Sequence, residues 1–389
     1  MPEPAARLSQ LPTYVFALIG ERVRQMASQG IDVVRLDIGS PDMPPPDFVV
    51  EKLAQAARNK NNHGYSDYKG TPDFRAAVAE HYRKCFNVEL NPDTEVLPLL
   101  GSKEGIVNLA LTYLGSGDVA LIPEIGYPSY TMGARLAGGD IHYVTMNADT
   151  DFLPDLDSIP QDVAERAKIL WVNYPNNPTG AIATLDFYQR AVDYCKKHDI
   201  LLASDNPYID IVYDGQPSIS ALQANNAKEH TVEFFSLSKS YNMAGWRIGA
   251  AVGSAAALKN LLKVKSNMDS GHFKAVYEAG IAALAQTRDE WAAERNRIYQ
   301  SRRDRIMAAL PEIGLRGYNP KGALYVWTEA VDGNAAQYLE DALCIAHVVL
   351  APGTAYGPTG EQFVRFGLTA KDERLDEALE RLKKWYKSK

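Results

Sequence analysis

Short apolar runs alternate with amphipathic stretches along most of the chain. Apolar runs of this kind, bounded by turn residues, are typical of the buried strands of a parallel sheet. The pattern predicts strands at Glu95–Leu100, Asp118–Ile122, Ile141–Thr145, Ile169–Val172, Ile200–Ser204, Thr231–Phe235 and Arg247–Val252. Because helical patterns separate these runs, we expect an α/β fold in which a largely parallel sheet is sandwiched between helices.

Two stretches near the N-terminus carry helix signals. Tyr14–Gln29 is amphipathic, and Asp32–Ile38 after it has the pattern of a strand. Thr71 is a favourable N-cap and Pro72 suits the first helical position, so a helix is predicted over Asp73–Phe86.

The C-terminal part of the chain predicts a second, smaller α/β unit. A long polar helix over Arg288–Leu310 leads into it. Strands are predicted at Leu324–Thr328, His347–Leu350 and Gln362–Gly367, and helices at Ala335–Leu343 and from about Lys371. We therefore expect a large domain of residues 46–285 and a small domain of residues 286–389, which an N-terminal segment of residues 1–45 joins.

Candidate chemistry begins where the strand Thr231–Phe235 ends. Lys239 follows it, with Ser236 and Ser238 nearby and Arg247 further on. A lysine there can hold an aldehyde as a Schiff base, and hydroxyls with a guanidinium suit a phosphate. An aldehyde and a phosphate on one small molecule suggest pyridoxal phosphate. The alternative is that Lys239 is an ordinary surface lysine.

The two preceding strands also end in polar residues. Asp205 closes the run Ile200–Ser204, and an anionic aspartate there can keep a pyridine nitrogen protonated. Tyr208 lies in the turn that follows and could donate to a ring oxygen. Asn177 follows Ile169–Val172. Taken singly, Asp205 could cap a turn and the segment of Asn177 could be a plain β-turn, but the three residues end successive strands.

With these residues, the chain resembles the class I/II aminotransferases of pyridoxal phosphate fold type I. The resemblance runs from Leu36-Asp37-Ile38-Gly39-Ser40-Pro41-Asp42 to Val364-Arg365-Phe366-Gly367. It implies that Lys239 is the Schiff-base lysine, that Asp205 pairs with the pyridinium, and that Asn177 and Tyr208 donate to the ring oxygen. Further implied cofactor residues are Tyr127, which stacks on the ring, and the phosphate-binding Ser102, Lys103, Ser236, Ser238 and Arg247.

The resemblance also implies substrate and partner contacts. Arg365 corresponds to the arginine that clamps the substrate α-carboxylate, and Gly39 to the glycine whose backbone closes over it, with Asn177 beside them. Tyr65 resembles the tyrosine that reaches the phosphate of a neighbouring subunit. We therefore expect a homodimer with shared active sites.

Composition narrows the possible partners. The chain has 389 residues, 46% of them hydrophobic and 23% charged, with a formal charge of −7. An acidic chain argues against nucleic acid, and no apolar run approaches the roughly 18 residues of a membrane span. The first residues lack the features of a signal peptide. Cys85, Cys195 and Cys344 have no metal or disulfide spacing, so we expect reduced core cysteines in a cytoplasmic protein, and no metal site.

The implied reaction moves an amino group between an L-amino acid and a 2-oxo acid by a ping-pong mechanism, with Lys239 as the proton-transferring base. The segment Lys263–Phe273 and the run Ser238–Trp246 are similar to the LL-diaminopimelate aminotransferase subgroup, with 2-oxoglutarate as the acceptor. An alanine, aspartate, glutamate or aromatic amino acid aminotransferase remains open. His272 is expected to be a surface histidine at a helix start.

Two other classes share the fold. Lyases that eliminate at Cβ or Cγ use the same cofactor residues, and they differ in needing no 2-oxo acceptor. Aminotransferase-like effector domains of transcription regulators carry a basic DNA-binding domain before the fold. The motifs here begin by Leu36 and the net charge is negative, so this second alternative is disfavoured.

Overall fold

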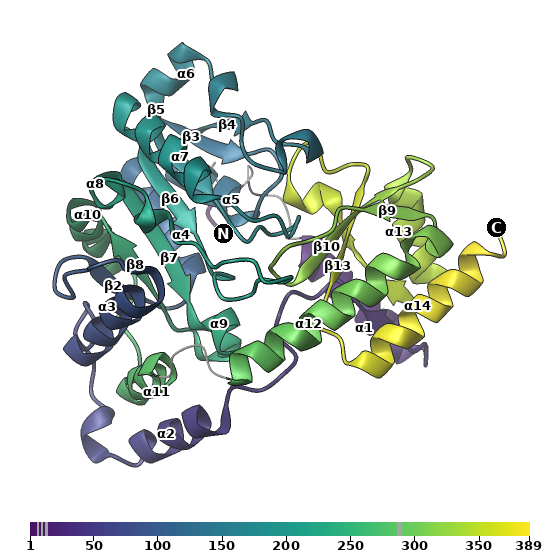
Figure 1. Cartoon of the computed structure of the whole chain (residues 1–389), viewed down its shortest axis with the longest axis horizontal. Coiled ribbons are helices and arrows are strands. Elements are labelled where there is room, and N and C mark those ends of the chain that lie inside the picture. The colour runs from purple at the N-terminus through teal and green to yellow at the C-terminus, as the bar shows by residue number, and fades with distance from the viewer. Residues whose placement is uncertain (6–7, 9–10, 12–14, 286–289) are drawn as a thin grey trace.

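A seven-stranded sheet dominates the computed structural model, which describes residues 1–5, 8, 11, 15–285 and 290–389 (Figure 1). The strand order is β2-β8-β7-β6-β5-β3-β4, and only β8 runs antiparallel to its neighbours within it. The strands are β2 (Val96–Leu99), β3 (Val119–Pro123), β4 (Asp140–Val144), β5 (Ala167–Val172), β6 (Leu201–Asp205), β7 (Thr231–Ser236) and β8 (Gly249–Gly253). The predicted largely parallel sheet is confirmed.

Helices cover both faces of this sheet because successive residues of each strand point to opposite sides. On β5, Leu170 and Val172 pack with α3 and α7, whereas Ile169 and Trp171 pack with α4 and α5. The helices of this part are α2 (Asp47–Ala57), α3 (Pro72–Phe86), α4 (Ser102–Tyr113), α5 (Ser129–Ala137), α6 (Gln161–Arg166), α7 (Leu185–His198), α8 (Ala227–His230), α9 (Leu237–Ser240), α10 (Ala255–Lys265) and α11 (Lys274–Ala285).

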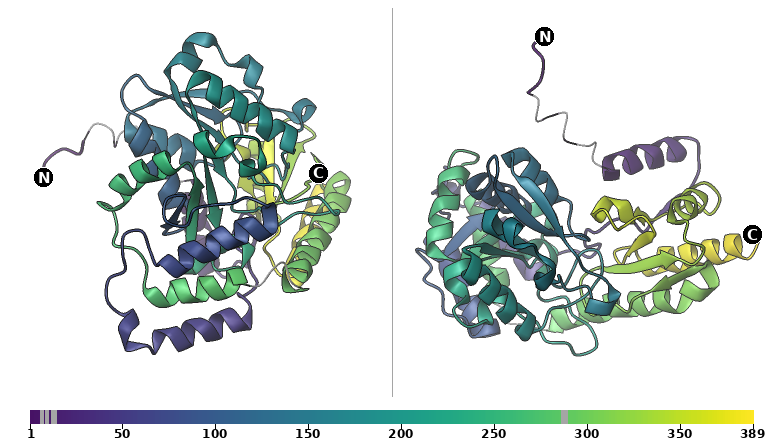
Figure 2. Two further views of the ribbon diagram at one scale, coloured as in Figure 1. Left: turned by 60° about the vertical axis from the view of Figure 1, so that its left-hand side comes forward. Right: turned by 90° about the horizontal axis from the view of Figure 1, so that it is seen from above.

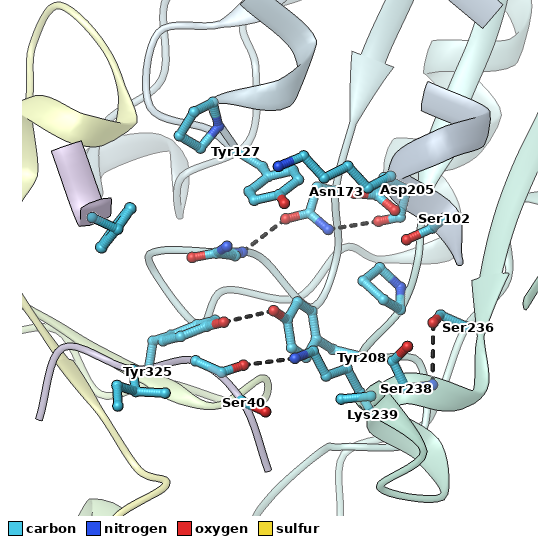
Figure 3. A pocket seen from close by; sticks show the side chains of 18 of the residues that line it. Ser40, Ser102, Tyr127, Asn173, Asp205, Tyr208, Ser236, Ser238, Lys239 and Tyr325 are labelled. Carbon is cyan, nitrogen blue, oxygen red and sulfur yellow. Dashed lines mark hydrogen bonds between the residues drawn. The ribbon is translucent and has the colours of Figure 1, made fainter. Parts of the chain in front are cut away.

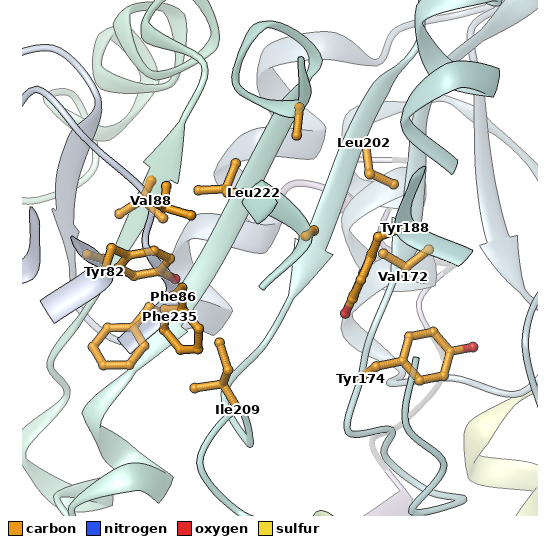
Figure 4. Close-up of a cluster of buried hydrophobic side chains, with 14 of the residues drawn as sticks. Tyr82, Phe86, Val88, Val172, Tyr174, Tyr188, Leu202, Ile209, Leu222 and Phe235 are labelled. Carbon is orange, nitrogen blue, oxygen red and sulfur yellow. The ribbon is translucent and has the colours of Figure 1, made fainter. Parts of the chain in front are cut away.

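The core on the α3 and α7 side is rich in aromatic side chains (Figure 4). The ring centroid of Tyr82 lies 5.3 Å from that of Phe86 and 6.0 Å from that of Phe235. A fully buried carboxylate, Glu233 on β7, accepts hydrogen bonds from Tyr82, Ser204 and Ser220 within this core. Donors of this kind offset the cost of burying a charge, so Glu233 ties α3 to the centre of the sheet.

A smaller sheet lies beside the first, in the order β12-β13-β10-β9 with antiparallel neighbours. Its strands are β9 (Leu315–Gly317), β10 (Tyr325–Ala330), β12 (Ala351–Pro352) and β13 (Phe363–Gly367), and its helices are α12 (Glu290–Ala309), α13 (Ala335–Cys344) and α14 (Asp372–Tyr386). In Figures 1 and 2, α12 extends from below the large sheet to the small one. This arrangement confirms the predicted second, smaller unit.

The N-terminal segment packs next to the small sheet. Helix α1 (Val15–Ser28) precedes β1 (Val34–Arg35), which pairs in parallel with β11 (Val348–Val349). The apolar Val34 and Leu36 enter the same core as the small sheet. This packing is in keeping with the predicted joining of residues 1–45 to the small domain, although the boundaries at 45 and 285 stay predictions.

Element positions differ from the sequence prediction in a few places. Of the residues Asp32–Ile38 that were predicted as a strand, only the two of β1 form one, because only these have a partner strand. Arg247, expected to begin a strand, precedes β8 with φ = +60°. Cys344 is exposed rather than a core residue. The predicted starting residues Tyr14 and Arg288 lie outside the described residues.

Among the described residues, none of the helices has the length and apolar character that crossing a membrane requires. The same residues hold no group of histidine, cysteine and acidic side chains that could bind a metal ion.

Candidate active site

A cavity of about 430 Å³ lies where the carboxyl ends of the central strands of the large sheet face the small sheet (Figure 3). The carboxyl edge of a parallel sheet is the usual ligand site of such folds. Its lining includes every site residue predicted from the sequence except Tyr65: Gly39, Ser102, Lys103, Tyr127, Asn177, Asp205, Tyr208, Ser236, Ser238, Lys239, Arg247 and Arg365. Residues far apart in the sequence thus converge on one cavity.

Lys239 lies on α9, the short helix that follows β7. Ser236 caps this helix by accepting a hydrogen bond from the backbone N–H of Ser238 at 3.2 Å. The Lys239 Nζ donates to the backbone oxygen of Gly39 at 2.6 Å. Burial, with the nearby guanidiniums of Arg247 and Arg365, lowers the pKa of Lys239 to about 8. A lysine of that pKa is a competent base near neutral pH.

Asp205 is the last residue of β6, at the base of the cavity. Its Oδ2 accepts a hydrogen bond from the hydroxyl of Tyr130 at 2.7 Å, and its Oδ1 is buried without a hydrogen-bond partner among the described residues. Burial raises the pKa of Asp205 to about 7. A buried carboxylate oxygen without a donor is costly, so this atom is suited to a cationic or protonated ligand group.

One end of the cavity surrounds the start of α4. Gly101, the N-cap, has φ = +80°, and a Cβ there would clash with Arg247 Nη2. Backbone N–H groups at a helix start favour anions. Ser102, Ser236, Ser238 and the guanidinium of Arg247 line the same end. Only glycine at position 101 lets Arg247 approach the helix start this closely.

Arg365 on β13 reaches the cavity from the small sheet. It donates to Asn177 Oδ1 at 2.9 Å and to the backbone oxygen of Asp37 at 2.5 Å. Its guanidinium lies over the ring of Tyr325, 4.1 Å from the centroid. The side chain is buried, so a substrate carboxylate would meet it with little competition from water.

Tyrosines line the remaining walls. The hydroxyls of Tyr208 and Tyr325 are 2.6 Å apart, as the dashed line in Figure 3 marks. Tyr127 also lines the cavity, and its ring lies edge-on to that of Tyr130 at 5.9 Å. Tyr208 therefore has a hydroxyl partner from the small sheet in place, which the sequence did not indicate.

Tyr65 lies apart from this cavity. Its side chain is 90% exposed in the single chain. The adjacent Ser66 is buried and donates to the backbone oxygen of His272 at 2.9 Å. The position of Tyr65 on the surface leaves it available to a second subunit.

The expectation that His272 is a surface residue is wrong. It is buried, its Nε2 lies 2.7 Å from the backbone oxygen of Arg247, and burial lowers its pKa to about 4. His272 therefore contacts the main chain of Arg247 and, through Ser66, the segment next to Tyr65.

Several site residues were not predicted from the sequence. Asn173 links two predicted residues, because its Nδ2 donates to the Asp205 backbone oxygen at 2.6 Å and its Oδ1 accepts from the Asn177 N–H at 2.8 Å. Its place directly after a buried strand was the available signal. Tyr130 and Tyr325 offered no such signal, since Tyr130 lies within a helix and Tyr325 within an apolar run typical of a core strand.

Arg295 on α12 contacts the main chain next to Lys239. This fully buried guanidinium donates to the backbone oxygens of Ser240 and, at 2.9 Å, of Asp210. The first of these carbonyls belongs to the C-terminal end of α9, where backbone acceptors lack helical partners. Arg295 therefore joins the segment of Lys239 to the segment after Tyr208.

A family model described as aminotransferase class I and II matches residues 31–382. The chain belongs to the class I and II aminotransferases. The chain is therefore an aminotransferase. Members of this family generally depend on pyridoxal phosphate.

Curated members of this aminotransferase family are similar over nearly the whole chain. An LL-diaminopimelate aminotransferase of Dehalococcoides mccartyi is 45% identical over 377 residues, which cover 97% of each chain. One from Aquifex aeolicus is 44% identical, again over 97% of each chain. Among solved structures, apo-BacF from Bacillus subtilis has a TM-score of 0.95 at 35% identity, with 99% of each chain covered. These findings confirm the predicted family and fold.

Proposed function

We propose that this aminotransferase binds pyridoxal phosphate in the cavity around Lys239 and transfers the amino group of LL-diaminopimelate to a 2-oxo acid. The observation that carries the proposal is that one cavity holds a base, a buried acid and a set of anion-binding groups. We call these groups the anion cradle; they are the start of α4 with Ser102, Ser236, Ser238 and Arg247. Lys239, Asp205 and the start of α4 at Ser102 supply these three groups.

The described residues fit pyridoxal phosphate. The unpartnered Oδ1 of Asp205 suits a protonated ring nitrogen, and a cation there would favour the carboxylate form of Asp205. Gly101 keeps open the space in which Arg247 and the helix start meet an anion. In this proposal the phosphate is held by Ser102, Lys103, Ser236, Ser238 and Arg247.

When bound, the cofactor supplies a ring that withdraws electrons from the substrate Cα. Lys239 would hold the cofactor, and its lowered pKa suits it to move a proton at the substrate Cα. Tyr127 would lie against the ring, and Asn177 and Tyr208 would supply hydrogen-bond donors to its oxygen. Arg365 orients the substrate by its α-carboxylate, and the Gly39 backbone closes beside it. Orienting the Cα–H bond toward Lys239 is the main contribution of these substrate contacts.

The substrate proposal rests on the relatives. Proteins 43 to 45% identical over nearly the full length carry the name LL-diaminopimelate aminotransferase. Solved structures with the same fold at lower identity include an aspartate aminotransferase from Thermus thermophilus, at 28% identity over 99% of this chain and 100% of that chain, with a TM-score of 0.91. Fold alone therefore does not select the substrate.

The proposal includes a homodimer in which Tyr65 of one subunit completes the anion cradle of the other. The support is the 90% exposure of Tyr65 beside a buried Ser66. The cytoplasmic location stays a prediction from cysteine usage.

Two measurements test the proposal. Borohydride reduction of the loaded protein followed by peptide mapping should label Lys239, and a label on another lysine would contradict the assignment. Transfer of the amino group from LL-diaminopimelate to 2-oxoglutarate should then be measured against alanine, aspartate and phenylalanine as donors. Equal or higher kcat/KM with one of these would replace the proposed substrate, and product release without any 2-oxo acceptor would indicate a lyase.

A further inference from the structure

Arg35 is a cavity residue to which the proposed reaction assigns no role. Five of the described residues that line the cavity are cationic, namely Arg35, Lys103, Lys239, Arg247 and Arg365. Among the described lining residues, two carboxylates accompany them, Asp37 and Asp205. The other four cations have proposed duties toward the phosphate, the reacting carbon and the α-carboxylate.

The guanidinium of Arg35 is held in a fixed orientation. Its Nε and Nη2 donate to the two carboxylate oxygens of Asp37, at 3.0 and 2.7 Å. The Asp37 side chain is almost fully buried, whereas that of Arg35 is 33% exposed. A buried carboxylate with both oxygens on one guanidinium restricts the rotamers of the arginine.

One edge of this guanidinium remains available. Of the five N–H groups of this guanidinium two donate to Asp37, and among the described residues the two on Nη1 and the second on Nη2 have no hydrogen-bond partner. Both carboxylate oxygens of Asp37 already accept from Arg35, and the Asp37 side chain is almost fully buried, so the free N–H groups of Arg35 are the more accessible part of the pair. The pair therefore presents donors rather than acceptors to a ligand.

Backbone contacts tie Arg35 to the α-carboxylate arginine. Arg365 Nη2 donates to the backbone oxygen of Asp37, two residues along the chain from Arg35. The main chain at Arg35 pairs with Val349 of β11. Two guanidiniums are thus fixed against one short extended segment, on rigid elements that suit a ligand with two anionic ends.

We propose that Arg35 binds the distal carboxylate of dicarboxylic substrates, with Asp37 as its positioning residue. The inference rests on the proposed function and deepens it, because LL-diaminopimelate and 2-oxoglutarate each carry a second carboxylate. One arginine then serves the donor in one half-reaction and the acceptor in the other.

The test uses the loaded enzyme and two unreactive probes, glutarate with two carboxylates and butyrate with one. Calorimetric titration should show that Arg35→Met weakens glutarate binding about 10- to 100-fold, the effect of losing a hydrogen bond to a charged group, and leaves butyrate binding unchanged. Arg35→Lys keeps the charge without the fork, so its glutarate affinity should be intermediate.

Arg316→Met is the matched control. Arg316 makes the same Nε and Nη2 fork to Glu329, at 2.8 Å for each contact, but does not line the cavity. Arg316→Met should leave the affinities for both glutarate and butyrate unchanged. Because Arg35→Met leaves Asp37 buried and unpaired, the double variant Arg35→Met/Asp37→Asn removes the charge as well. It should show the same loss for glutarate if the protein folds.

Kinetics give a second readout. The ratio of kcat/KM for glutamate to that for alanine should fall about 10-fold or more in Arg35→Met, through KM rather than kcat. Equal losses for both probes, or unchanged glutarate binding, overturn the subsite. If Arg35-dependent glutarate binding occurs without turnover of LL-diaminopimelate, the subsite stands and the proposed donor falls. If LL-diaminopimelate is turned over equally well without Arg35, the proposed donor stands and the subsite falls.

Discussion

The hydroxyl of Tyr130 donates a hydrogen bond to Oδ2 of Asp205, at 2.7 Å, with both side chains buried. Tyr130 is itself held by stacking on Trp171, with ring centroids 4.8 Å apart. Desolvation raises the pKa of Asp205, and the Tyr130 bond opposes that shift. The tyrosine therefore fixes one carboxylate oxygen while the other remains without a partner among the described residues.

Asp205→Asn should retain the cofactor but lose most of the rate of transamination. A neutral amide no longer stabilises a protonated ring nitrogen, and loss of one partner of a buried ion pair costs about 3 to 5 kcal/mol, or roughly 100- to 5,000-fold in rate. Steady-state kcat with saturating cofactor measures it. Tyr130→Phe keeps the carboxylate and should cost less than Asp205→Asn. A near-normal kcat in Asp205→Asn would contradict the role.

The lowered pKa of Lys239 predicts a titration in the cofactor-free protein. Competitive labelling with an amine reagent should show Lys239 becoming reactive near pH 8. Between pH 8 and the usual lysine pKa near 10.4, the folded state binds fewer protons than the unfolded state, so the free energy of unfolding should rise with pH across this window. Arg247→Met should move the labelling midpoint upward, since it removes a nearby positive charge. A midpoint near that of exposed lysines would refute the prediction.

Gly101→Ala should weaken cofactor binding. The added Cβ would meet Arg247 Nη2, and the left-handed backbone adds strain. Gly117→Ala is a matched control, because Gly117 has φ = +91° with open space where an added methyl group would lie. We expect both variants to lose about 1 kcal/mol of stability from backbone strain, and only Gly101→Ala to lose cofactor affinity, by about 10-fold or more. Equal affinities would remove Gly101 from the cradle.

Tyr65→Phe should weaken cofactor affinity by about 10- to 100-fold, as for a lost hydrogen bond to a charged group. Tyr68→Phe, a nearby and also exposed tyrosine, is the control. Mixing Lys239→Ala subunits with subunits carrying Tyr65→Glu should restore part of the activity, because a mixed dimer can place both lesions in one site. No recovery in verified mixed dimers would place Tyr65 in its own subunit's site.

The sequence placed candidate residues correctly in the cavity where they follow buried strands. Asp205 comes directly after an apolar run and Lys239 four residues after another, so the parallel topology alone brings them to one edge. Ser102 and Arg247 meet for a further reason, since the antiparallel β8 lies next to β2 although about 150 residues separate them in sequence. Hydrophobic periodicity does not specify which strands are neighbours.

The residues that contact the candidate site residues from outside the cavity could not be predicted from the sequence, for a different reason. Tyr130 and Arg295 lie on helices, and their partners are 75 and 55 residues away along the chain. His272 follows glycine in a polar stretch, which indicated a surface position. It is buried because the segment passes between Ser66 and the main chain of Arg247. Such contacts follow from tertiary packing, which local polarity does not reveal.

The contact of Arg295 with the carbonyl of Ser240 also bears on the order in which the site is completed during synthesis. A nascent chain that ends before residue 295 contains Lys239, Asp205 and the anion cradle, but it lacks the donor that caps the end of α9. Arg365, which contacts Asn177, comes later still. The ribosome therefore delivers Lys239 well before Arg295 and Arg365, so an incomplete chain carries the amine without the contacts that complete the cavity.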